Sequence, residues 1–423
     1  MSTTRRMDED PPRRMRDLLI DRRFGSIFWG KFVSSNGIWI HGVTAAIAIF
    51  AATGSTSAVA LVATAQFAPQ LLTPWSGSWS DRGWERFQLI SGRVLCTLGS
   101  AICAVAMIFW GDGGWGTATP LVVGTAAVGI GFAVGGPSQQ AVIPRLVRPC
   151  ELPTAIAMNT APLTMARIMG PGAGALLAAQ WGAAAAFLVA MVCHAVFTVI
   201  LVVVRIPRGA AAGKDDDSSI RHALSYLHHR RPLLFALFAV MASGIGAEPT
   251  LTTAPALANE LHGGAYLVGT LSIAFGVGSA IGLMMLGVVV RRTSQEWATT
   301  AGLVVMVVGL GITAALPTVA AALGGFTLVG AGFVMTLTAA TSLVQERIPD
   351  NLRGRIMAFW LLSFVGARPV TALCIGPLAD ATSPGAAIGA VAGVLAVAAV
   401  ACQPRRLRHT ASSPGLGTSS ASR

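Results

Sequence analysis

Long apolar stretches recur along almost the whole chain and are separated by short polar connections. Each holds about 20 residues or more, the length at which an α-helix crosses the hydrocarbon core of a bilayer, whereas barrel strands are about half as long and alternate in polarity. The pattern therefore predicts an all-α membrane protein with twelve transmembrane helices. The predicted spans are residues 26–50, 57–80, 87–110, 118–140, 153–178, 184–204, 233–256, 266–290, 297–316, 319–343, 354–378 and 384–402.

Basic residues fall in the terminal segments and in every second connection, and four of them lie inside predicted spans: Lys31, Arg93, Arg167 and Arg368. Cytoplasmic connections carry the excess of Lys and Arg in membrane proteins. We therefore predict that both termini and the 205–232 connection are cytoplasmic. The strong preference for Arg over Lys, with abundant Ala and Gly, hints at a bacterial genome, so we expect a multi-pass protein of the bacterial plasma (inner) membrane.

The composition excludes a soluble domain, because 53% of the residues are hydrophobic and only 11% are charged, against roughly 25% charged in soluble proteins. The net charge of +12 follows from the topology, so the lipid bilayer is the expected partner and no nucleic acid is. The six cysteines lack metal-ligand spacing, and Walker-type and His-Glu-x-x-His motifs do not occur. We expect no metal, no cofactor and no enzymatic activity.

A polar segment divides the spans into two sets of six, and the two sets resemble each other. The segment 54–82 aligns with 264–292 at a constant offset, and the Ile-Pro and Gly-Pro pairs of 143–171 recur in 348–377. A duplicated six-helix unit is typical of transporters that rock two halves about a central site. The predicted organisation is a cytoplasmic N-terminal tail (1–23), a six-helix bundle (24–205), a cytoplasmic linker (206–232), a second bundle (233–402) that is pseudo-symmetric with the first, and a disordered cytoplasmic tail (403–423).

Three segments resemble motifs of the major facilitator superfamily, and specifically of its bacterial drug:proton antiporter-like exporters. Residues 77–86 (GSWSDRGWER) are similar to the signature between helices 2 and 3, and residues 166–175 (ARIMGPGAGA) to the Gly-Pro-x-x-Gly-Gly element of helix 5. Residues 348–355 (IPDNLRGR) are similar to the Pro-x-x-x-Arg-Gly-Arg segment before helix 11. The resemblance covers residues 24–402 and implies the twelve-helix major facilitator fold.

The first motif indicates a conformational latch at the cytoplasmic end of helix 2, formed by Gly77, Asp81, Arg82 and Arg86. An acid beside the helix ends of the other half can break and re-form contacts as the halves move. The alternative is an ordinary solvated pair of charges in a loop. The sequence departs from the family pattern at Trp84, where Gly is usual, and at Glu85, where Arg is usual.

Glu248 and His41 are the candidates for proton coupling. Glu248 is the one acid well inside a predicted span, and a carboxylate at that depth marks a site for protons or for a cationic substrate. The alternative is an acid that water reaches through helix breaks at Pro249 and Pro255. His41 can titrate near neutral pH, but a neutral structural histidine is as consistent with its position. Asn36 lies where related exporters often carry an acid, and an amide cannot titrate.

Two further sets of residues are candidate functional groups. The helix 5 element comprises Arg167, Gly170, Pro171 and Gly174, whose small residues allow close helix approach, although general packing uses the same residues. Arg167 and Arg368 lie deep in corresponding spans, and for both we expect interhelical hydrogen bonding more than substrate contact. The candidate substrate cavity, in which Arg368 is included, comprises Asn36, Trp39, Gln139, Asn159, Thr338, Trp360 and Arg368.

The sequence thus predicts a monomeric secondary transporter that exports a small amphipathic molecule by alternating access, with proton antiport as its drive. Within transporters, the alternative is a dedicated exporter of a siderophore or of a self-made antibiotic. From another class, the alternative is a non-transporting membrane sensor on the same fold, which the altered signature between helices 2 and 3 keeps open.

Overall fold

The computed structural model describes residues 13–79, 84–111, 113–204, 220–349 and 352–408, and within these ranges the regular structure is entirely helical. The helices are α1 (Met15–Ile20), α2 (Phe24–Thr53), α3 (Thr56–Phe67), η2 (Ala68–Leu72), α4 (Thr73–Trp79), α5 (Glu85–Phe109), α6 (Trp115–Ala141), η4 (Ile143–Arg145), η5 (Pro149–Glu151), α7 (Leu152–Val203), α8 (Ile220–His229), α9 (Arg231–Ala247), α10 (Pro249–Thr252), α11 (Ala254–Glu260), α12 (Gly264–Arg292), α13 (Gln295–Ala315), α14 (Val319–Arg347), α15 (Arg353–Ala381), α16 (Pro384–Ala401) and α17 (Pro404–Leu407).

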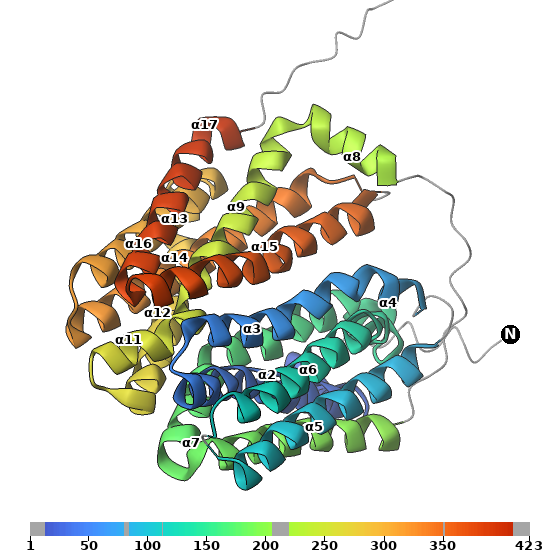
Figure 1. The fold of residues 1–423 in the computed structure, drawn as a ribbon. Coiled ribbons are helices and arrows are strands. Elements are labelled where there is room, and N and C mark those ends of the chain that lie inside the picture. Colours follow the sequence, from blue (N-terminus) through green and yellow to red (C-terminus); the bar gives the residue numbers. More distant parts are fainter. Residues whose placement is uncertain (1–12, 80–83, 112, 205–219, 350–351, 409–423) are drawn as a thin grey trace, which may run out of the picture.

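The helices form two bundles, one of α1–α7 and one of α8–α17, which meet along one side and diverge toward the ends that carry α4 and α8 (Figure 1). Ten helical segments of the described chain are long and apolar enough to cross a membrane. One of them, α7, contains Gly182 in a non-helical conformation (φ 84°, ψ 161°), which divides it into two halves. With the interrupted series α3–η2–α4 this accounts for twelve crossings, and the predicted fold class is confirmed.

Helix boundaries follow from local chemistry. Ser55, Ser294, Thr318 and Ser383 each begin a helix by accepting a hydrogen bond from a backbone N–H of its first turn, as N-cap residues do. The series α9–α10–α11 is interrupted at Pro249 and Pro255, because proline supplies no N–H to the helix and clashes with the preceding turn. These short segments bring Glu248 to a break in the helix.

The two bundles contact each other through α7 with α12 and through α3 with α15. Figure 1 shows α3 and α15 side by side at the ends where α3 begins and α15 finishes. Gly376 of α15 permits this approach, since a Cβ atom there would lie 2.8 Å from the Cβ of Ala60 and 3.0 Å from the Cα of Ser57. Close approach through small residues is the usual way in which helices associate in a membrane.

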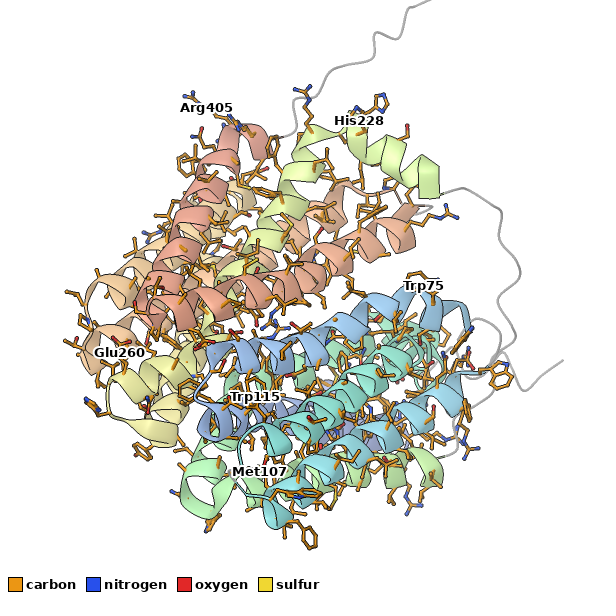
Figure 2. The ribbon with its side chains drawn as sticks, in the orientation of Figure 1. Trp75, Met107, Trp115, His228, Glu260 and Arg405 are labelled. Atoms are coloured by element: carbon orange, nitrogen blue, oxygen red, sulfur yellow. The ribbon has the colours of Figure 1, made fainter. Side chains whose placement is uncertain are left out.

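Each bundle has identifiable ends (Figure 2). Trp75 and Trp115 lie near opposite ends of the first bundle, and both are more than half exposed. In the second bundle Arg405 and His228 lie at one end and Glu260 at the other. Exposed indole groups near helix ends are typical of the membrane–water interface.

The N-terminal segment packs on the first bundle from Arg13 onward. The Arg13 guanidinium binds both carboxylate oxygens of Glu151, at 2.7 and 2.9 Å, and one oxygen of Asp21 at 2.9 Å. Leu18 of α1 is fully buried in the cluster that also holds Phe24. The predicted tail 1–23 is therefore part of the bundle over the residues that the structure describes.

Candidate functional site

Two adjacent cavities, of about 50 and 150 Å³, lie between the bundles. Trp39 of α2, Arg167 of α7 and Arg368 of α15 line both of them. Because the lining comes from both bundles, a movement of one bundle against the other changes the cavities. The other lining residues are Ile38, Val43, Gln66, Phe67, Gln70, Val128, Gly129, Phe132, Leu163, Pro171, Ala247, Thr250, Leu251, Ser272, Phe275, Phe333, Trp360, Leu361, Phe364 and Val365.

A buried ion pair stands at the wall of these cavities. The Nε atom of Arg368 donates to a carboxylate oxygen of Glu248 at 2.7 Å, and the Thr252 hydroxyl donates to the other oxygen at 2.9 Å. Glu248 is fully buried, and the Arg368 guanidinium also stacks on Phe67 of the first bundle, 3.9 Å from the ring centre. Removing one partner of such a pair leaves an uncompensated buried charge, which is costly.

The Arg167 guanidinium is surrounded by aromatic rings. Its Cζ atom lies 5.7 Å from the ring centre of Trp39 and 5.5 Å from those of Phe333 and Phe364 in the second bundle. Its Nε atom is enclosed and has no hydrogen-bond partner. A cation over aromatic faces is stabilised electrostatically, but its N–H donors stay available to an acceptor.

Aromatic side chains continue along the second bundle's side of the cavities. Phe275, Phe333 and Phe364 lie in contact with their neighbours at centroid distances of 5.7 and 6.2 Å, and Trp360 stacks on Phe364 at 5.7 Å. The Trp360 indole donates to Thr341 at 3.0 Å. The site therefore combines one buried ion pair, one guanidinium with open donors and a broad apolar wall, which suits an amphipathic ligand.

Of the other predicted cavity residues, Asn36 donates to the carbonyl of Phe32, and the Thr338 carbonyl accepts from Ser342. Both are half-buried, and neither lines the two cavities.

Gln139 and Asn159 belong to a polar network inside the first bundle. The Lys31 ammonium donates to the backbone and side-chain oxygens of Asn159 at 2.7 and 2.8 Å. Arg93 donates to Ser34 at 3.1 Å and to Gln139 at 3.3 Å. Both cations are buried, and over the described part of the chain no carboxylate pairs with either of them. The sequence places both cations inside predicted spans but indicates no partner for either.

His41 is fully buried away from the cavities. Its ring nitrogens lie 3.1 Å from the hydroxyls of Ser100 and Thr125, and its ring packs on Phe187 at 5.2 Å. Two hydroxyl partners within one bundle favour the structural interpretation of this histidine.

The helix 5 element has two faces. Gly170 and Gly174 lie against Trp39 and Ile40 of α2, where a Cβ atom would lie within 2.7 Å of their atoms. Pro171, between them, lines the smaller cavity with Arg167. The element therefore fixes α7 against α2 and presents Arg167 to the cavities.

The predicted latch is described only in part. Gly77 lies in α4 and Asp81 and Arg82 lie outside the described residues, while Arg86 donates to the carbonyl of Val202 at 3.2 Å. Glu85, noted only as a departure from the family motif, pairs with Arg145 at 2.7 Å.

The second bundle repeats this ion pair with Glu296 and Arg347, also at 2.7 Å. The two acids occupy the first turns of α5 and α13. The sequence distance from Glu85 to Glu296 is close to the offset between the two aligned repeats. This spacing is the signal that could have identified the two acids.

Sequence reasoning also missed Asp380, near the end of α15. Its carboxylate accepts hydrogen bonds from the Ser55 hydroxyl, the Thr56 N–H, and both the N–H and the hydroxyl of Ser57, at 2.6 to 2.9 Å. All four donors belong to the start of α3 in the other bundle. The acid therefore joins the bundles at this end.

Two apolar bundles with a charged and aromatic cavity between them define a membrane transporter. A model of the transmembrane secretion effector family, within the major facilitator superfamily, matches residues 19–416. The chain belongs to this family, and it is a secondary transporter, not an enzyme.

Solved structures support the fold assignment. A bacterial homologue of the iron transporter ferroportin, in an inward-facing state, is 17% identical with a TM-score of 0.70, over 89% of this chain and 98% of that one. A POT family transporter in complex with a thioalcohol-conjugated peptide is 11% identical with a TM-score of 0.68, over 91% and 95%. A D-xylose–proton symporter is 15% identical with a TM-score of 0.65, over 91% and 99%. No curated protein sequence matches the chain.

Proposed function

We propose that the chain exports a small amphipathic molecule across the bacterial plasma membrane by alternating access, with proton antiport as the drive and both termini in the cytoplasm. The observation that carries the proposal is the buried Glu248–Arg368 pair at the wall of a cavity lined from both bundles. The family's description as secretion effectors supports the outward direction.

The junction between the bundles supports alternating access. Asp380 and Gly376 hold α15 against α3 at one end, whereas the bundles diverge toward α4 and α8 (Figure 1). In the proposed orientation, the closed end faces outward and the diverging ends face the cytoplasm. The opposite state requires that the Asp380 contacts break.

Glu248 is the proposed proton carrier. Protonation removes its negative charge and ends the charge-assisted bond with Arg368, which then loses its partner beside the cavity. A proton can thus alter both the charge and the contacts of a residue that lines the site. Because Glu248 is already paired with Arg368, direct pairing of Glu248 with a cationic substrate is the less supported role.

The test uses everted membrane vesicles that contain the protein and the neutral amphipathic dye Nile red. Uptake into vesicles acidified inside corresponds to export, and we expect it to stop when nigericin collapses the pH gradient. Glu248→Gln should abolish gradient-driven uptake, whereas Glu260→Gln, a change at an exposed acid of α11 (Figure 2), should leave it intact. Uptake by Glu248→Gln equal to that of the native protein would remove Glu248 from the mechanism.

A dedicated exporter of a siderophore or antibiotic uses the same site, and a thermal-shift screen of purified protein against drugs, siderophores and metabolites distinguishes the two.

A further inference from the structure

The charge of Arg167 is not neutralised by any described residue. No carboxylate pairs with it and no hydrogen-bond acceptor meets its Nε atom, yet its side chain lines both of the adjacent cavities described above. An arginine carries five N–H donors and stays protonated in proteins. An enclosed N–H donor without an acceptor is rare, because desolvated donors cost free energy when they are unpaired.

The surroundings of Arg167 are apolar and aromatic. Trp39 lies on one side, and Phe333 and Phe364 reach it from the second bundle, all within 5.7 Å of its Cζ atom. The other arginine of the cavities, Arg368, is already bound to Glu248. Arg167 is therefore the one cavity-lining charge, among the described residues, that is free to bind a ligand.

The nearby interior of the first bundle is also positive. Lys31 and Arg93 are buried, and in the described part of the chain their partners are neutral oxygens and, for Arg93, two aromatic rings. The described acids that are buried in this bundle, Glu85 and Glu151, each have an arginine partner. The field at the cavity thus repels cations and attracts anions.

We propose that Arg167 is the binding site for the anionic group of the substrate, and that the substrate class is an amphipathic organic acid: a carboxylate held by the guanidinium, with an apolar or aromatic body against Trp39, Phe333 and Phe364. The inference rests on the proposed export function and specifies its substrate. A carboxylate matches the planar donor fork of arginine. Export of an anion moves with an inside-negative membrane potential, so the potential adds to the drive.

The test compares three probes with one apolar body: 4-phenylbutyrate, 4-phenylbutyramide and 4-phenylbutylamine. Each competes with radiolabelled 4-phenylbutyrate for the purified protein in a scintillation proximity assay. We expect the acid to bind about tenfold more tightly than the amide, the difference that one charge-assisted hydrogen bond produces, and the amine to bind more weakly than the amide.

Arg167→Gln should remove the preference for the acid, and Arg167→Lys should retain part of it. Arg406→Gln is the matched control, because the Arg406 guanidinium also lies over an aromatic ring, 5.8 Å from the ring centre of Phe235, but does not line the cavities. Thermal unfolding verifies that each variant is folded. A native protein that binds amide or amine as tightly as acid, or an Arg167→Gln variant that keeps the preference, overturns the proposal.

Failure of the proposed function gives a different result. If Nile red uptake is independent of Glu248 while the acid preference persists and depends on Arg167, the anion site stands and proton-driven export does not. If uptake depends on Glu248 but the preference is absent, export stands and the anion site is overturned.

Discussion

The carboxylate of Asp380 accepts hydrogen bonds from the hydroxyl of Ser57 at 2.6 Å and from its backbone N–H at 2.9 Å, across the junction of the two bundles. With the Ser55 hydroxyl and the Thr56 N–H, it caps the start of α3 from outside that helix. A carboxylate at a helix N-terminus also interacts favourably with the helix dipole. One acid in α15 thus holds the first turn of a helix in the other bundle.

We therefore expect Asp380→Asn to weaken the closure at this end. A hydrogen bond to a charged group contributes about 1.5–3 kcal/mol, so the open population should rise about tenfold. The measurement is the labelling of Ala63→Cys by a membrane-impermeant maleimide in intact cells, in a background without the native cysteines. Ala63 is buried where α3 meets α15. Unchanged labelling would show that the contact does not control this end.

Gly376→Ala should also weaken the closure at this end and increase the labelling of Ala63→Cys, for a steric reason. The added Cβ atom would lie 2.8 Å from that of Ala60, so α15 must move away from α3. Alanine is the better helix former by about 1 kcal/mol. A lower helix propensity therefore cannot be the cause of weaker closure. Gly393→Ala in α16, where a Cβ meets nothing within 4 Å, is the control and should label as the native protein does.

The Glu248–Arg368 pair predicts strong coupling in a double-mutant cycle. Glu248→Gln and Arg368→Gln should each destabilise the purified protein by about 3–5 kcal/mol, because each leaves one buried charge unpaired. The double variant should be destabilised by clearly less than the sum. Additive losses, measured by thermal unfolding in detergent, would argue against a direct pair.

The docking of α1 should depend on pH at the acidic end of the range. Partial burial acts to raise the pKa of Asp21. Hydrogen bonds from the backbone N–H groups of Phe24 and Arg23 and from the Arg13 guanidinium outweigh this effect, so the pKa of Asp21 is lowered. The stability contributed by Asp21 is therefore complete above its unfolded-state pKa, about 3.9, and is lost as the pH falls through the lower folded-state value.

Hydrogen exchange of residues 13–23, corrected for intrinsic rates, should accordingly show full protection at pH 5 and reduced protection at pH 2.5. Asp21→Asn should reduce the difference between the two conditions. Equal protection of the native segment at both pH values would contradict the prediction.

The fold could be predicted from sequence because hydrophobic length and the positions of Arg and Lys are local signals. The helix breaks at Pro249 and Pro255 could also be predicted from the sequence. Pairings over long sequence distances could not be predicted: the sequence makes Glu248 a candidate functional acid, but its partner Arg368 lies 120 residues away. Asp380 lies near the end of a span and resembles any acid that meets solvent. Only the fold reveals that the start of α3 lies beside it.

The ion pairs Glu85–Arg145 and Glu296–Arg347 each clasp two helices of the same half. Neither ion pair has to break when the two halves move from one open state to the other. The contacts between the halves, such as those of α7 with α12 and of α3 with α15, are the ones that must change. Single replacements there can therefore shift the balance between the two forms without disturbing either folded half.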